Sequence, residues 1–195
     1  MEQSVLEKIA SAKLVPVLRA DTADSALATA ERLLANGLTV IELTATTPGW
    51  QSALARLHAD HPQATLGVGT VVTASDAAAA LDGGAQFLVS PWPAPPVRDM
   101  AEARGHPFLE GGFTPAELAA ATARGVAKLF PAHVGGVAYL KSLLAVLPGA
   151  RIMPTGGIKL DQVAQWLAAG AFAVGVGSEL ADIPASRVRE VLDEL

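Results

Sequence analysis

The sequence contains no cysteine, which excludes disulfide bonds, thiolate metal sites and cysteine nucleophiles. It has no cluster of Lys or Arg longer than a pair, and its formal net charge is -5. The sequence therefore indicates no positively charged surface that would bind nucleic acid or an anionic membrane. No segment approaches the roughly 18 apolar residues of a membrane span, and the amino terminus lacks the basic and apolar regions of a signal peptide. These absences favour a cytoplasmic protein whose partner is a small molecule.

The histidines offer no metal site. There are four of them, and none stands in a metal-ligand motif. They are His58, His61, His106 and His133. We therefore expect no metal, and we look for the chemistry among the Lys, His, Glu, Asp, Ser and Thr side chains.

The chain is rich in apolar residues arranged as alternating strands and helices. With 195 residues, 51% apolar and 17% charged, it can bury a sizeable core and fits a single domain over 1–195. Short β-rich runs predict eight strands, at 14–18, 39–43, 65–69, 86–90, 107–110, 127–130, 151–154 and 172–176.

Helical stretches rich in Ala and Leu separate these strands. They lie at 23–35, 49–59, 75–80, 97–103, 115–123, 136–147 and 160–169, with a leading helix at 2–12 and a trailing one at 185–195. This alternation predicts an α/β fold, a closed (β/α)₈ TIM barrel, and an open doubly wound sheet is the alternative. In such a barrel the active site lies at the carboxyl ends of the strands. Polar residues at those ends are Arg19, Glu42, Thr44, Thr70, Ser90, Glu110, Lys128, Thr155 and Ser178.

Lys128 is a lone charge inside the apolar run 126–131. An amine surrounded by Val126, Leu129 and Phe130 loses hydration, which lowers its pKa and makes the neutral, nucleophilic form available near neutral pH. The position is typical of a lysine that forms a Schiff base with a carbonyl substrate.

Glu42 is the matching lone charge in another apolar strand, 39–43. A carboxylate in a barrel mouth needs a partner or a raised pKa, and Lys128 is the natural partner. The simpler interpretation is a buried ion pair with no reaction, which contributes little stability. Two lone charges at the ends of different strands favour catalysis, with the amine as nucleophile and the carboxylate moving protons. That combination describes a class I aldolase.

Two glycine-bearing loops follow the seventh and eighth strands, at 154–158 and 175–178. In this fold such loops often hold a phosphate on backbone N–H groups, and Ser178 adds a hydroxyl. Paired glycines alone indicate only turns, but their position after the last two strands of the alternation indicates an anion site.

Arg19 and Thr70 follow the first and third strands. A guanidinium at Arg19 suits a bidentate clamp on a carboxylate, with the Thr70 hydroxyl beside it, and a solvated loop arginine is the alternative. The remaining lysines are expected to be exposed in helical or helix-start segments; they are Lys8, Lys13, Lys141 and Lys159. Of the tryptophans, Trp50 and Trp166 are expected to pack in the core and Trp92 to line a mouth.

Four motifs in this order resemble one family. The segments 41–44 (IELT), 67–70 (GVGT), 128–132 (KLFPA) and 154–158 (PTGGI) are similar to those of the 2-keto-3-deoxy-6-phosphogluconate (KDPG) and 4-hydroxy-2-oxoglutarate (KHG) aldolases. The resemblance covers almost the whole chain. It implies a barrel-shaped class I aldolase, usually a homotrimer, that reversibly cleaves a 2-keto-4-hydroxy acid to pyruvate and an aldehyde without a metal or cofactor.

The resemblance also implies roles for individual residues. Lys128 would form the Schiff base, Glu42 would act as general acid and base, and Thr70 would help hold the pyruvyl carboxylate. The distal anion site, which receives the phosphate of the aldehyde, would be lined by Gly156, Gly157, Gly177 and Ser178.

This chain departs from the family pattern at four places. The gluconate enzymes carry an arginine shortly after the catalytic glutamate, where this chain has Thr46. Arg19 and the segment 48–50 instead resemble the 2-dehydro-3-deoxy-6-phosphogalactonate branch, in which an arginine after the first strand serves the carboxylate. Glu110 stands where proline is usual and adds a negative charge to the rim, and His133 replaces a residue that is more often Glu or Ser.

These departures leave the substrate open among the gluconate, the galactonate and unphosphorylated 4-hydroxy-2-oxoglutarate. Two other functions also stay open. One is a phosphate-binding barrel isomerase or epimerase that uses Glu42 as a proton base, and the other is a binding barrel without catalysis.

Overall fold

The computed structural model describes residues 3–195, apart from the side chains of Ser178 and Ala185. Its sheet has eight parallel strands in the order β7-β6-β5-β4-β3-β2-β1-β8. The strands are β1 (Leu14–Leu18), β2 (Val40–Thr44), β3 (Thr65–Gly69), β4 (Phe87–Val89), β5 (Phe108–Gly112), β6 (Val126–Leu129), β7 (Arg151–Pro154) and β8 (Val174–Val176).

The sheet closes on itself between its two outer strands. A parallel bridge joins Thr155 to Gly175, and the N–H of Phe172 donates to the carbonyl of Ile152 at 2.8 Å. With β1 paired to β8 as well, the strands form a barrel. The predicted (β/α)₈ fold is confirmed, and the open doubly wound sheet is ruled out.

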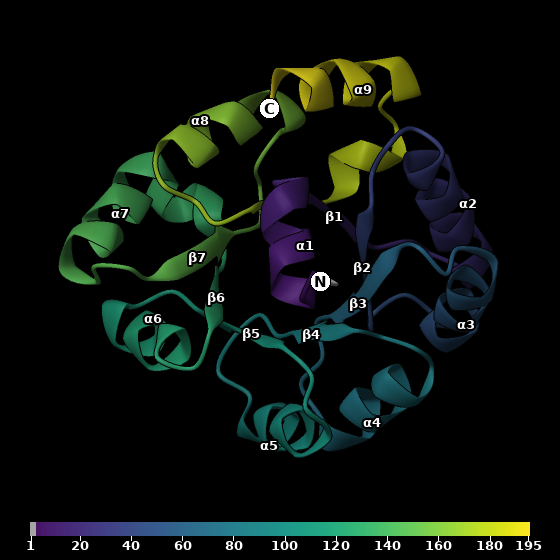
Figure 1. The fold of residues 1–195 in the computed structure, drawn as a ribbon, viewed down its shortest axis with the longest axis horizontal. Coiled ribbons are helices and arrows are strands. Elements are labelled where there is room, and N and C mark those ends of the chain that lie inside the picture. Colours follow the sequence, from purple (N-terminus) through teal and green to yellow (C-terminus); the bar gives the residue numbers. More distant parts are fainter. Residues whose placement is uncertain (1–2) are drawn as a thin grey trace.

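Helices surround the barrel on its outside (Figure 1). They are α2 (Ala23–Leu34), α3 (Trp50–Asp60), α4 (Ala74–Asp82), α5 (Pro95–Arg104), α6 (Pro115–Thr122), α7 (Ala132–Val146), α8 (Val163–Ala168) and α9 (Ala185–Glu194), with short 3₁₀ turns η1 (Leu160–Gln162) and η2 (Ser178–Ala181). Across residues 3–195, none of the helices combines the length and the apolar character that a bilayer crossing requires.

The leading helix, α1 (Val5–Ala12), lies over one end of the barrel (Figure 1). It begins later than the predicted 2–12 because Ser4 caps it, accepting the N–H of Glu7 while the Glu7 carboxylate accepts the N–H of Ser4. Residue 2 lies outside the described residues. Ile9 of α1 is fully buried and packs with Val15 and Val40 inside the barrel, so the amino-terminal end is closed.

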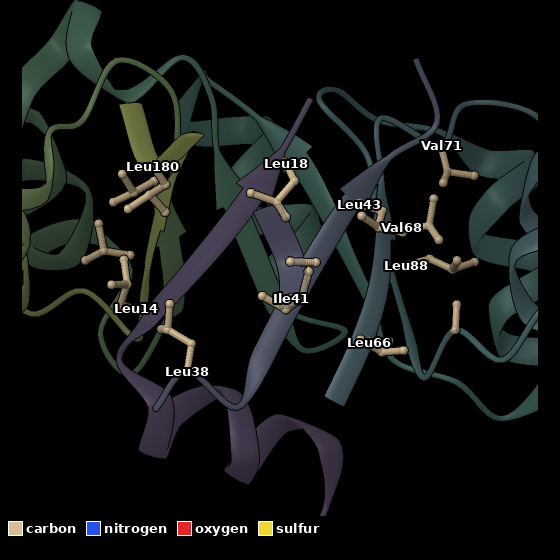
Figure 2. Packing of buried hydrophobic residues seen from close by; sticks show 14 of the residues in the cluster. Leu14, Leu18, Leu38, Ile41, Leu43, Leu66, Val68, Val71, Leu88 and Leu180 are labelled. Atoms are coloured by element: carbon tan, nitrogen blue, oxygen red, sulfur yellow. The ribbon is translucent and has the colours of Figure 1, made fainter. Parts of the chain in front are cut away.

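The strands are apolar on both faces because other side chains cover both faces. One face points into the barrel, where Val15, Phe87 and Met153 belong to a single buried cluster. The other face packs under the helices, and Figure 2 shows Leu18 and Leu43 there, which are register partners on β1 and β2. Burying each such side chain contributes roughly 1.5–3 kcal/mol. The near-continuous apolar strands of the sequence are typical of such a doubly covered parallel sheet.

Two helices are interrupted or divided where the sequence predicted one continuous helix. The helix predicted at 136–147 begins at Ala132, and it is interrupted at Gly136, where φ is 65° and ψ is -174°. The helix predicted at 160–169 is divided into the 3₁₀ turn η1 and the shorter α8. Both differences fall just after the strands whose loops form the candidate site.

Glu110 does not lie at the barrel mouth, and the prediction of a negative charge on the strand-five rim is wrong. Its side chain lies on the outer face of β5, where it accepts the N–H of Ala94 at 2.8 Å and Nε of Arg98 at 3.0 Å. A second contact from the guanidinium makes this a bidentate ion pair whose side chains are 19% and 6% exposed. The pair therefore ties α5 to the barrel.

We expect the Arg98→Ala variant to lose about 3–5 kcal/mol of unfolding free energy, because it leaves the carboxylate of Glu110 buried without its counter-charge. Arg104→Ala is the matched control, since Arg104 pairs with Asp82 on the surface with side chains 40% and 66% exposed. Its loss should stay below about 1 kcal/mol. Urea unfolding of both variants measures the difference, and equal losses would contradict the structural role of the Glu110 pair.

Candidate active site

A cavity of about 840 Å³ opens at the carboxyl ends of the strands. Residues from seven strand ends and the loops after them line it. They are Val17, Arg19, Thr44, Thr70, Pro91, Trp92, Lys128, Phe130, Thr155, Gly156, Gly157, Ile158, Lys159, Gly177 and Glu179. The cavity has the size and the mixed apolar and polar lining of a small-molecule site.

Lys128 lies at the base of this cavity. It follows Val126 on β6 by two positions, so both side chains point to the inside of the barrel. The Lys128 side chain is only 4% exposed, and its Nζ stands 5.4 Å from the centre of the Phe130 ring, where the π-face attracts a cation. The prediction of a buried amine facing a small-molecule cavity is therefore confirmed.

Glu42 on β2 is fully buried next to Lys128, with Oε1 3.6 Å from Nζ. Within the described part of the chain, neither carboxylate oxygen of Glu42 accepts a hydrogen bond. Burial raises the pKa of Glu42, and the charge of Lys128 only partly opposes this rise. A carboxyl with a raised pKa and free lone pairs is suited to exchange protons with a bound substrate.

Gly69 on β3 makes the space that Glu42 occupies. A Cβ atom at this position would stand 1.7 Å from Glu42 Oε1, so the carboxylate would have to move from its place beside Lys128. Glu42 and Gly67 are register partners on neighbouring strands, and Gly69 is the next inward position of β3. The glycine of the 67–70 motif is therefore a requirement of the carboxylate beside it.

Arg19 and Thr70 both line the cavity, as predicted. Arg19 is exposed there and makes no ion pair or side-chain hydrogen bond with the rest of residues 3–195. Thr70 has a φ of 59°, a conformation that is costly for a β-branched residue, about 1–3 kcal/mol, and that tends to mark functional sites.

Threonines after β2 form a chain of hydrogen-bonded hydroxyls. Thr46 Oγ1 donates to Thr44 Oγ1 at 3.2 Å, and Thr44 and Thr47 share a hydrogen bond of 3.3 Å. Thr47 Oγ1 accepts the N–H of Ala20 at 3.1 Å. This chain of hydroxyls connects the end of β2 to the loop that carries Arg19.

The glycines predicted for the distal anion site come together at one end of the cavity. Gly156, Gly157 and Gly177 all line it. Gly156 and Gly157 have φ values of 98° and 68°, which glycine adopts without strain. Ser178 begins η2, but its side chain lies outside the described residues.

The other residues named from the sequence lie partly at the cavity and partly in the core. Trp92 lines the cavity and is 56% exposed, whereas Trp50 and Trp166 are buried in the core, as predicted. His133 is exposed, with Nδ1 3.3 Å from the carbonyl of Gly156, so it packs on the glycine loop. Ser90 is buried and supports the strand-four loop through the carbonyl of Trp92.

Lys159 and Glu179 are cavity residues that the sequence interpretation missed. Lys159 is exposed as predicted, but it lines the cavity directly after the 154–158 loop. Glu179 lines the same end, directly after the 175–178 loop. Their positions in the sequence could have predicted this placement, because a charged residue that directly follows the loop after a barrel strand lies at the mouth of the barrel. Among residues 3–195, no group of three His, Asp or Glu side chains is arranged to hold a metal ion.

The comparisons with known proteins agree with this geometry. The family model of the KDPG and KHG aldolases matches residues 5–192. The chain belongs to this family. A 2-dehydro-3-deoxy-phosphogluconate aldolase of Haemophilus influenzae is 36% identical over 169 residues, which cover 85% of this chain and 80% of the relative.

Members of both substrate branches of the KDPG and KHG aldolases resemble the chain. The 2-dehydro-3-deoxy-6-phosphogalactonate aldolase of Escherichia coli is 32% identical over 171 residues, or 86% of this chain and 83% of the relative. A KDPG aldolase of Legionella pneumophila, solved with pyruvate captured as a covalent carbinolamine, is 28% identical with a TM-score of 0.84 and covers 98% of both chains.

In this KDPG/KHG aldolase we expect Glu42→Gln to change how stability depends on pH. Because folding raises the pKa of Glu42, the folded chain binds more protons than the unfolded chain above the unfolded pKa of about 4.3. The contribution of Glu42 is therefore full below that pH and is lost as pH rises toward the folded pKa. The unfolding free energy of the unsubstituted chain minus that of Glu42→Gln should fall as pH rises above about 4.3.

Glu117→Gln is the control with the opposite sign. Hydrogen bonds from the backbone N–H groups of Thr114 and Phe113 lower the pKa of Glu117. Its contribution is present above the unfolded pKa and is lost as pH falls, so the corresponding difference should rise with pH in the acid range. Urea unfolding over a pH series measures both, and a Glu42 difference that rises with pH would show that folding does not raise its pKa.

Proposed function

We propose that the chain is a class I aldolase that reversibly cleaves a 2-keto-4-hydroxy acid, such as KDPG, to pyruvate and an aldehyde, such as glyceraldehyde 3-phosphate. The observation that carries this proposal is the 3.6 Å separation of Lys128 Nζ and Glu42 Oε1, both buried at the base of a cavity that fits a small molecule. The carbinolamine in the Legionella pneumophila relative supports the covalent step.

Lys128 is the nucleophile in this mechanism. Its neutral amine adds to the C2 ketone of the substrate, water leaves, and an iminium forms. The iminium accepts the electron pair of the C3–C4 bond while the C4 hydroxyl loses its proton, which releases the aldehyde and leaves a pyruvyl enamine. Protonation of the enamine at C3 and hydrolysis of the resulting iminium release pyruvate and restore the amine.

Glu42 moves the protons of these steps. It donates a proton when water leaves the carbinolamine, accepts the proton of the C4 hydroxyl, and delivers one to C3 of the enamine. Its raised pKa suits this alternation, because the carboxyl then changes protonation state closer to neutral pH. The absence of hydrogen bonds to its oxygens among the described residues leaves both free for substrate.

The rest of the cavity binds the two ends of the substrate. We assign the pyruvyl carboxylate to Arg19 and Thr70, which supply a guanidinium and a hydroxyl on one side of the cavity. We assign the distal end, including a phosphate where the substrate has one, to the loops of Gly156, Gly157, Gly177 and Ser178. The arginine on the β1 loop favours the galactonate branch as the alternative substrate, and unphosphorylated 4-hydroxy-2-oxoglutarate is a further one.

We also propose a homotrimer located in the cytoplasm. This proposal is supported by the family resemblance and by the charge and composition of the chain.

Treatment with pyruvate and borohydride should add the mass of one reduced pyruvyl group to Lys128, because hydride reduces the iminium to a stable secondary amine. Mass spectrometry of the digested protein locates the adduct. Lys128→Met should form none, whereas Lys141→Met, which removes an exposed lysine of α7, should form it fully.

An unsubstituted protein without the adduct would refute the aldolase proposal. The same experiment separates it from a barrel isomerase or epimerase that uses Glu42 as base, because that chemistry needs no covalent lysine and should survive Lys128→Arg.

Arg19→Ala should raise the KM for pyruvate in the condensation direction by about ten- to hundredfold, because charge-assisted hydrogen bonds to the carboxylate are lost. The kcat should change little, since this contact is the same in the ground and transition states. Arg56→Ala is the control, because Arg56 pairs with Asp24 at the surface, away from the cavity. An unchanged KM in Arg19→Ala would refute the carboxylate assignment.

A further inference from the structure

The distal end of the cavity carries one positive and one negative side chain. Lys159 follows the Gly156–Gly157 loop, and Glu179 follows Gly177, so the two charges flank the backbone assigned to the distal end of the substrate. The described residues contain no ion pair within 4.0 Å between them. Both residues line the cavity, so both charges contribute to the potential that an anion meets there.

Glu179 is held in place by its own hydrogen bond and by the backbone around it. Its Oε2 accepts the N–H of Leu160 at 3.1 Å, directly after Lys159. The guanidinium of Arg32 donates to the carbonyls of Leu180 and Ala181 at 2.6 and 3.0 Å, which anchors η2 to α2. A carboxylate fixed in this way cannot easily turn out of the cavity when an anion enters.

A phosphate monoester carries about -1.5 to -2 charges at pH 7, so a site built for it gains from an excess of positive charge. Here the single ammonium of Lys159 is offset by the carboxylate of Glu179. Salt screens charges over about 8 Å at physiological ionic strength, and Glu179 contacts Leu160, just after the Gly156–Gly157 loop, so its repulsion reaches an anion on that loop. A hydroxyl group, in contrast, can donate a hydrogen bond to the same carboxylate.

We propose that Glu179 is a specificity-determining residue that weakens phosphate binding at the distal end, so that unphosphorylated 2-keto-4-hydroxy acids with terminal hydroxyl groups are substrates as well. This inference rests on the proposed aldolase function. Lys159 has the opposite effect and retains part of the affinity for the phosphorylated compound.

The test compares kcat/KM for KDPG with that for its unphosphorylated counterpart, 2-keto-3-deoxygluconate. The preference for KDPG should be within about tenfold in the unsubstituted enzyme and should rise by about tenfold or more in Glu179→Gln, as removal of a facing like charge predicts. Glutamine keeps an oxygen that accepts the Leu160 N–H, so this variant removes the charge and preserves the hydrogen bond. Lys159→Met should shift the preference in the opposite direction.

Each outcome bears on the proposal. An unchanged preference in both Glu179→Gln and Glu179→Ala, with thermal unfolding like that of the unsubstituted enzyme, would overturn it. So would a preference for KDPG above about a thousandfold in the unsubstituted enzyme, or turnover of neither compound.

Borohydride trapping of pyruvate on Lys128 is measured in parallel with these assays. If the unsubstituted enzyme shows no Lys128 adduct, the aldolase function fails and the Glu179 proposal falls with it. An adduct together with an unchanged preference overturns the Glu179 proposal alone.

Discussion

The contact between Lys128 and Glu42 determines how the carboxyl end of the barrel is built. Removing two charged groups from water costs free energy, which their mutual attraction offsets only when they lie close together. Here Nζ of Lys128 and Oε1 of Glu42 are 3.6 Å apart, and both side chains are almost fully buried. Space for the carboxylate requires glycine at position 69, because any Cβ there would overlap Oε1. The apolar packing of Val15, Phe87 and Met153 below the pair keeps water out and keeps the pKa of Glu42 raised.

The second buried carboxylate of the molecule shows what a purely structural ion pair looks like. Glu110 accepts hydrogen bonds from Arg98 and from the backbone of Ala94, so its lone pairs are occupied, and it does not line the cavity at the barrel mouth. Glu42 has one cation nearby and no hydrogen-bond donor among the described residues, and it lies at a cavity. The difference in hydrogen bonding separates a carboxylate that holds a helix to the barrel from one that is free to take up protons.

Three charged side chains line the cavity besides Lys128; they are Arg19, Lys159 and Glu179. Arg19 is exposed and without an ion pair among the described residues at one side, which suits the carboxylate common to all 2-keto acids. Lys159 and Glu179 lie beside the glycine loops after β7 and β8. In the proposed assignment, the part of the substrate that all members of the family share meets a cation without an ion pair, whereas the part that varies meets one positive and one negative side chain. Such a layout separates the chemistry of the reaction from the choice of aldehyde.

Much of this protein follows from its sequence alone. The alternation of apolar strands and Ala-rich helices predicted the barrel, because strand periodicity and helix length are local properties of the chain. The lone charges at Lys128 and Glu42 predicted a buried pair, which the structure places 3.6 Å apart and which we propose as the reacting pair. Only the tertiary structure decided which face of its strand each polar residue occupies. Glu110 lies one register position away from the inward Gly111 and therefore faces a helix, and Glu179 faces the cavity because η2 is anchored to α2 by Arg32. These outcomes depend on strand register and on contacts between segments about 150 residues apart, such as Arg32 with Leu180 and Ala181, which no local pattern in the sequence records.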